Sequence, residues 1–165
     1  MKRVCGTILI ALLMCVPVFA IRGYSVSVSS PQIFDSFGDV CCNDEYAHLD
    51  NFALALQNQP DVQGYIVFYG GKHQSYPSCQ GRKMLPRRGE AQARAARMKP
   101  YLVDRRSVDS ARVIVIDGGY REAWTAELWI VPRGGSAPTP SPTVKAKQIR
   151  YRKGRIKKRA YECEV

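Results

Sequence analysis

The spacing of apolar residues predicts a first helix shortly after Asn43. Asn43 is a suitable N-cap, and the acidic residues Asp44 and Glu45 fall in the first turn, where the helix dipole favours negative charge. Pro60 marks the end of the pattern. The predicted core stripe repeats at i, i+3, i+4 and i+7 and consists of Leu49, Phe52, Ala53 and Leu56.

A second helix is predicted from about Gly89 to Arg105. Pro100 lies inside it and is expected to kink the helix, because proline has no backbone N–H. The predicted core face carries Ala91, Ala95, Met98 and Leu102. Three basic residues, Arg94, Arg97 and Lys99, are expected to point away from that face.

Two nearly continuous apolar runs predict strands that are buried on both faces. The first run is Gly64–Tyr69, and Gly70-Gly71 is expected to end it. The second is Arg112–Ile116, which Asp117-Gly118-Gly119 is expected to close. A polar segment between Lys72 and Arg88 is long for a loop inside a compact domain, and loops of this length are often functional.

Two further segments show the alternation of a strand with one wetter face. In Ala123–Val131, one face carries Trp124 and the other carries Glu127 and Trp129. The alternation in Tyr24–Val28 is weaker and predicts a first strand ahead of the helices.

The order of these elements is β-α-β-α-β-β. Strands joined by helices favour parallel neighbours, and the short connection Asp117–Glu122 allows the last two strands to form a hairpin. We therefore predict an α/β fold, an α+β sandwich in which two helices pack on one mixed sheet.

The first twenty residues are typical of an export signal. Lys2 and Arg3 precede an apolar stretch, and Val18-Phe19-Ala20 places small residues where a signal peptidase cleaves. The stretch is shorter than the roughly 20 residues of a comfortable membrane span. We expect a signal peptide at 1–20, a domain at 21–133, an extended Pro/Ser/Thr linker at 134–143 and a basic tail at 144–165, with export to the periplasm or the outer membrane and no transmembrane span after cleavage.

The charge of the chain points to an anionic partner. Its 25 lysines and arginines against 14 acidic residues give a formal net charge of +11. The tail concentrates basic residues at Lys145, Lys147, Arg150, Arg152, Lys153, Arg155, Lys157, Lys158 and Arg159. Outside the cytosol, an anionic envelope polymer or lipid head groups are the favoured partners. Nucleic acid is less favoured, and a protein partner remains open.

Export also suggests that the cysteines form disulfides. The expected mature chain keeps an even number, Cys41, Cys42, Cys79 and Cys163, in an oxidising compartment. Three pairings are possible. Together with His48 and His73, these cysteines do not match the spacing of zinc ligands, so we predict neither a metal site nor a cofactor.

Several stretches together resemble the OmpA-like peptidoglycan-binding domain family. Phe34-Asp35 looks like the opening "FD", and 65–70 looks like the strand that leads into its "GHTD" turn. AQARAARMKPYL at 91–102 looks like "LSERRAEAVKDYL", 108–113 looks like "IDPSRI", and 118–122 looks like "GYGE". The resemblance covers roughly 34–131.

The resemblance implies a ligand pocket. In that family an Asp after the second strand and an Arg early in the second helix hold the diaminopimelate carboxylate of the peptidoglycan stem. Arg94 occupies the position of the Arg, but Gly70-Gly71-Lys72-His73 replaces the turn that carries the Asp. The implied ligand-binding set is thus Arg94, Gly70, Gly71, Lys72 and His73, in a diverged pocket.

The same fold also implies a disulfide. If the first two strands are parallel neighbours, the loop with Cys41 and Cys42 lies beside the loop with Cys79. A bond from Cys79 to Cys41 or Cys42 is then expected, with Cys163 left for the other cysteine or for another molecule.

No nucleophile motif or C-x-x-C pair indicates catalysis, and the acidic residues beside Gly118-Gly119 are typical of turns. We expect a non-catalytic exported envelope protein that binds peptidoglycan or a related wall component. The alternative is a structural or interaction protein whose basic tail contacts an anionic polymer, a membrane surface or an acidic protein.

Overall fold

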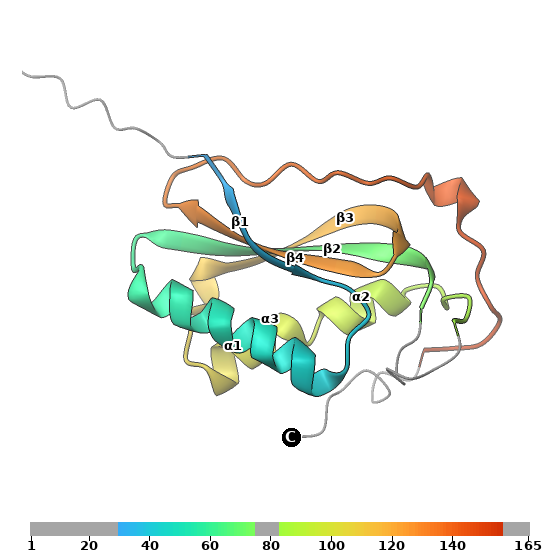
Figure 1. The fold of residues 1–165 in the computed structure, drawn as a ribbon, viewed down its shortest axis with the longest axis horizontal. Helices are drawn as coiled ribbons and strands as arrows, with labels where there is room; N and C mark the ends of the chain where they lie inside the picture. Colours follow the sequence, from blue (N-terminus) through green and yellow to red (C-terminus); the bar gives the residue numbers. More distant parts are fainter. Residues whose placement is uncertain (1–29, 75–82, 157–165) are drawn as a thin grey trace, which may run out of the picture.

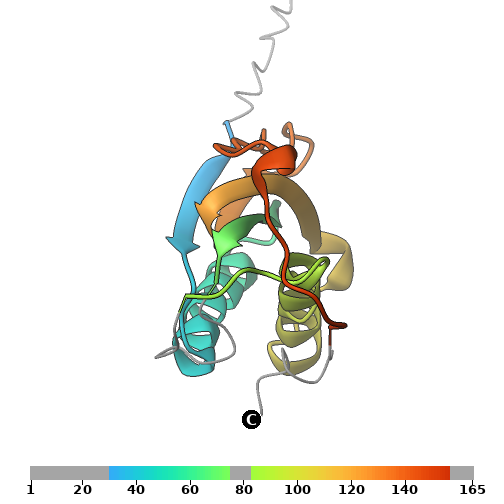
Figure 2. The ribbon, with the colours of Figure 1, turned by 90° about the vertical axis from the view of Figure 1, so that its right-hand side faces the viewer.

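A computed structural model describes residues 30–74 and 83–156 of the chain, and it has two layers (Figure 1). A four-stranded mixed sheet forms one layer, and helices cover one of its faces (Figure 2). The elements are β1 (Gln32–Phe37), α1 (Cys42–Asn58), β2 (Val62–His73), α2 (Glu90–Ala95), α3 (Met98–Pro100), η1 (Tyr101–Arg105), η2 (Ser110–Arg112), β3 (Val113–Ala123), β4 (Thr125–Pro132) and η3 (Ala146–Gln148). This order confirms the predicted succession of strands and helices.

The sheet order is β1-β4-β2-β3, so the last two strands are not hydrogen-bonded neighbours. β3 pairs with β2 in parallel, while β4 pairs with the other edge of β2 and with β1, both antiparallel. The predicted hairpin is therefore wrong, because β2 lies between its two strands. The premise that β1 and β2 are neighbours is also wrong, because β4 separates them.

Gly71 allows this arrangement, because the connection between β3 and β4 passes close over it. A Cβ added at Gly71 would lie only 2.4 Å from the backbone nitrogen of Trp124 and 2.7 Å from the carbonyl carbon of Ala123. Gly70-Gly71 was expected to end the strand, but β2 continues through both glycines to His73. The glycines instead mark the place where one part of the chain crosses another.

Asp117-Gly118-Gly119 also lies within a strand, since β3 runs on to Ala123. The register of β2 against β3 shifts between Phe68 and Gly70, and Gly119 adopts a φ of 89° at this irregularity. Glycine tolerates that angle far better than other residues. The glycine pair thus bends the strand rather than stopping it.

The predicted helical core is confirmed except at Ala91, which is only partly buried. The four stripe residues of α1 are at most 2% exposed, and Ala95, Met98 and Leu102 of the second helical segment are at most 1% exposed. α1 begins at Cys42 with Cys41 as N-cap, two residues before the predicted N-cap Asn43. The second segment is divided into α2, α3 and the π-helical η1 around Pro100, which cannot donate the hydrogen bond of a regular helix.

The first strand of the sheet, β1, includes Phe34-Asp35, whereas the predicted strand Tyr24–Val28 lies outside the described residues. Within residues 30–74 and 83–156, none of the helices has the length and apolar character needed to span a bilayer.

The segment after β4 lies across the sheet face that the helices leave open (Figure 2). The backbone N–H of Ser141 donates to the Tyr69 hydroxyl at 3.2 Å, and Val144, 6% exposed, forms a β-bridge with Tyr120. Glu127, expected on a wetter face, is 6% exposed and pairs with Arg121 at 2.6 Å. The expected linker therefore packs on this face of the sheet, where Tyr69 and Glu127 are buried.

Candidate functional site

Arg94 is buried and already bound by the chain itself. Its side chain is 2% exposed and forms an ion pair with Asp39. A second carboxylate, Glu45, lies 3.6 Å from its Nη2, and the guanidinium stacks 3.8 Å from the ring centroid of Trp124. The prediction that Arg94 points away from the core is wrong. Since its charges are satisfied internally, Arg94 is not free to receive a ligand carboxylate.

Asp39, Glu45, Arg94 and Arg97 form one group, which we call the Arg94 cluster. Glu45 is fully buried and accepts from Arg97 Nε at 2.8 Å and from its Nη2 at 2.5 Å. Burial lowers the pKa of Arg94, and the carboxylates of Asp39 and Glu45 oppose that shift. The cluster ties the connection between β1 and α1 to the second helical segment.

The other predicted ligand residues separate into two places. Gly70 and Gly71 line a pocket at the end of β2, near the start of α2. Lys72 and His73 line a different depression, together with residues of the basic tail. The structure therefore does not bring the predicted set together around one ligand.

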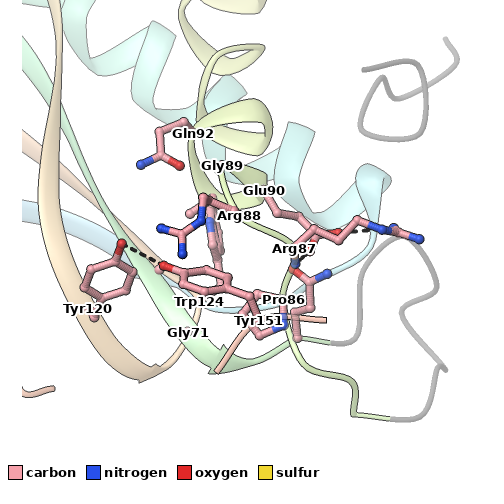
Figure 3. Close-up of a pocket in the computed structure, with 13 residues that line it drawn as sticks. Gly71, Pro86, Arg87, Arg88, Gly89, Glu90, Gln92, Tyr120, Trp124 and Tyr151 are labelled. Atoms are coloured by element: carbon pink, nitrogen blue, oxygen red, sulfur yellow. Dashed lines mark hydrogen bonds and ion pairs between the residues drawn. The ribbon is translucent and has the colours of Figure 1, made fainter. Parts of the chain in front are cut away.

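The pocket at the end of β2 has a volume of about 320 Å³ and is shown in Figure 3. We call it the β2-end pocket. Its size is near the lower end of the range for small-molecule sites. Its walls come from β2, the start of α2, β3 and the C-terminal segment. The described lining residues are Gly70, Gly71, Gln74, Pro86, Arg87, Arg88, Gly89, Glu90, Ala91, Gln92, Tyr120, Trp124 and Tyr151.

Arg88 is the exposed cation of this pocket (Figure 3). Its guanidinium lies 4.6 Å from the ring centroid of Tyr151, a cation–π contact that orients it. Among the described residues, no carboxylate forms an ion pair with Arg88. Its hydrogen-bonding fork is therefore available to an anionic ligand.

Three buried N–H groups on residues of the pocket lining lack acceptors among the described residues. They are Nε2 of Gln74, Nε1 of Trp124 and Nε of Arg87. A buried donor without a partner costs about 1–3 kcal/mol, so such groups call for an explanation. Because these atoms are buried beneath the pocket surface, they favour an anion in the pocket through their dipoles rather than through direct contact.

Two tyrosines complete the polar part of the wall. The hydroxyls of Tyr120 and Tyr151 lie 3.0 Å apart. The hydrogen bond from Tyr151, together with burial, raises the pKa of Tyr120 to about 12. Tyr120 therefore keeps its proton at neutral pH and remains a neutral hydrogen-bonding group.

The one acidic residue on the described lining, Glu90, is already neutralised. It is 1% exposed, its Oε1 lies 3.3 Å from Nη2 of Arg152, and its Oε2 accepts from the backbone N–H of Arg87. Arg152 comes from the C-terminal segment, and its N–H donates to the carbonyl of Pro86 at 3.0 Å. The C-terminal segment thus supports the pocket as well as contributing Tyr151.

Sequence reasoning missed Gln74, Arg88, Tyr120, Trp124 and Tyr151 as members of one site. The unusual length of the polar segment that ends at Arg88 was the available signal. Nothing in the sequence pattern placed Tyr151, a residue of the tail, beside that segment.

The second depression, which we call the basic groove, has a volume of about 430 Å³. Its described lining residues are Lys72, His73, Leu85, Lys147, Gln148 and Arg150. Other basic residues of the tail, Lys145, Lys153 and Arg155, are exposed, while Lys157, Lys158 and Arg159 lie outside the described residues.

The remaining candidates have structural surroundings. His48 Nδ1 lies 2.6 Å from Asp35 Oδ2, and the His48 ring stacks on Phe37. These two contacts connect α1 to β1. The disulfides of Cys41 and Cys42 stay a prediction, because Cys79 and Cys163 lie outside the described residues. No group of three or more potential metal ligands occurs in the described part of the chain.

No protein-family model matches this chain, and no curated protein matches it.

Proposed function

We propose that this protein is a non-catalytic binding module of the cell envelope, and that the β2-end pocket holds a carboxylate of its ligand. One observation carries the proposal. Arg88, an arginine with no ion-pair partner among the described residues, lines the pocket together with three residues whose buried N–H groups lack acceptors. All four groups are donors, so the pocket is complementary to an acceptor-rich anion.

A carboxylate suits this pocket better than a bulky polyanion. A guanidinium can grip both oxygens of a carboxylate in a bidentate fork. The glycines and the rings of Tyr120 and Tyr151 leave about 320 Å³, enough for the end of a peptide or a modified sugar. Peptidoglycan stem peptides present such carboxylates, which agrees with the family resemblance and with the export expected from residues 1–20.

The pocket chemistry favours binding over catalysis. Its described lining includes no serine, cysteine or histidine to act as a nucleophile or a base. Its only carboxylate, Glu90, is held by arginines. The proposal thus moves ligand recognition from Arg94, the position that the resemblance implied, to Arg88.

Calorimetric titration of the purified protein with a soluble muropeptide that carries diaminopimelate tests the proposal. A hydrogen bond to a charged group contributes about 1.5–3 kcal/mol, so Arg88→Ala should weaken binding by roughly tenfold or more. Arg105→Ala is the matched control, since it removes the same charge from an exposed residue outside the pocket lining. It should leave the affinity unchanged.

A pull-down on purified peptidoglycan sacculi at low and high salt complements the titration. Binding through the pocket should survive high salt and fall with Arg88→Ala. If the muropeptide does not bind, or if both arginine variants bind it equally well, the pocket is not the recognition site for this ligand.

A further inference from the structure

We propose that the basic groove is a second binding site, and that it takes a linear envelope polymer with phosphate groups along its chain. The groove goes beyond the carboxylate pocket, because it has different residues and a different chemistry. Anion binding was expected of the whole basic tail, and we assign it here to one defined surface.

The groove brings together basic residues from distant parts of the sequence. Lys72 and His73 come from the end of β2, whereas Lys147 and Arg150 come from the C-terminal segment. Such convergence raises the local positive potential above that of isolated surface lysines. The net charge of +11 strengthens the attraction of a polyanion at long range.

The cations of the groove are available for binding. Among the described residues, no carboxylate forms an ion pair with Lys147 or Arg150, and both are exposed. Lys72 pairs with Glu122 at 2.7 Å, but the Glu122 side chain is 71% exposed. Exposed pairs contribute little free energy, so a phosphate can compete for Lys72.

The C-terminal segment holds these cations in place. Ile149, between Lys147 and Arg150, is 8% exposed, and Ala146–Gln148 forms the 3₁₀ turn η3. The Gln148 side chain accepts from the backbone N–H of Lys145 at 2.9 Å. Binding therefore requires less ordering of the backbone than it would in a flexible tail, and the entropic cost is lower.

The lining favours a polymer recognised by charge over single-stranded nucleic acid. Proteins usually hold single strands by stacking bases on aromatic side chains, and the described lining of the groove contains no aromatic ring. Lysine and arginine both bind phosphate well, and neither requires a planar ligand. The groove thus fits repeated phosphates along a flexible chain.

The test measures binding of inorganic polyphosphate, and separately of single-stranded DNA of similar charge, across a salt series. The double variant Lys147→Ala/Arg150→Ala should bind polyphosphate roughly tenfold or more weakly, at about 1 kcal/mol per cation. Its affinity should also depend less steeply on salt. Lys99→Ala/Arg105→Ala removes the same charge from outside the groove and should change the affinity much less.

Two outcomes would overturn the proposal. Equal losses in the two double variants would mean that net charge, and not the groove, attracts the polymer. Tighter binding of DNA than of polyphosphate, with the same dependence on Lys147 and Arg150, would assign the groove to nucleic acid. Arg88→Ala should leave polyphosphate binding intact, so failure of the groove is distinguishable from failure of the pocket.

Discussion

Arg94 and Arg88 lie close together in the sequence, yet they occupy opposite chemical situations. Arg94 is buried and bound by Asp39 and Glu45, whereas Arg88 is exposed and no carboxylate among the described residues forms an ion pair with it. Whether an arginine is open to a ligand depends on the carboxylates that the fold places around it. Its position in a family pattern did not predict this.

The two regions are nevertheless connected through Trp124. Arg94 stacks on one side of its indole, and Trp124 also lines the β2-end pocket. The Arg94 cluster thus supports a wall of the pocket without contacting the ligand. We infer that Arg94 is a positioning residue, and that Arg88 is the residue that contacts the ligand.

The largest expected effect comes from breaking the Arg94 cluster. Glu45→Gln removes the buried charge opposite Arg94 and Arg97, and loss of one partner from a buried ion pair typically costs about 3–5 kcal/mol. Chemical denaturation should report this loss of unfolding free energy. Asp44→Asn removes a charge from the neighbouring exposed residue in the first turn of α1 and should cost less than about 1 kcal/mol.

Equal stability of these two variants would contradict the structural role of the cluster. Arg88→Ala should behave in the opposite way to Glu45→Gln. It should lose ligand affinity while keeping the stability of the unmodified protein. Measuring stability and affinity for each variant therefore separates the two regions directly.

An intermediate effect is expected from undocking the C-terminal segment. Val144→Asp places a charge at a site that is 6% exposed and should cost about 1–3 kcal/mol. Because the segment carries Tyr151 and Arg152, ligand affinity should fall too, while the helical core stays folded. Limited proteolysis should show faster cleavage within 134–156. The neighbouring control Thr143→Asp, at an exposed residue, should behave like the unmodified protein. If Val144→Asp is cleaved no faster than the unmodified protein, the C-terminal segment is not docked on the sheet through Val144.

Local periodicity predicted much of the fold, because it reports which face of each element is buried. The stripe from Leu49 to Leu56 is an example, and all of it lies in the core. The placement of β2 between β3 and β4 could not be predicted in this way. It depends on a close passage of Trp124 over Gly71, a contact between distant residues, whereas glycine pairs alone indicate turns.

The candidate site was harder to predict, because it depends on long-range contacts. Glu45 of α1 and Asp39 of the connection before it neutralise Arg94 of α2, and no spacing rule reports that contact. The basic, proline-rich composition of the C-terminal segment suggested a free linker and tail. In the structure Tyr151 pairs with Tyr120, and Pro138 and Ile149 are buried.

The smallest expected effect concerns the hydroxyl pair of Tyr120 and Tyr151 on the pocket side of this comparison. Tyr120 has a pKa of about 12, above the ordinary value of 10.0, chiefly because of its hydrogen bond with Tyr151. A group whose folded pKa is raised stabilises the protein fully below pH 10, and this contribution is lost between pH 10 and 12.

Absorbance titration of phenolate, compared between the protein and Tyr120→Phe, should show the missing phenol near pH 12. Tyr151→Phe should move the titration midpoint of Tyr120 down toward 10. The ligand affinity of the unmodified protein should not change between about pH 6 and 9, because the Tyr120 phenol keeps its proton over that range. A missing phenol that titrates near pH 10 would mean that the two hydroxyls are not paired in solution and that the C-terminal wall of the pocket is open.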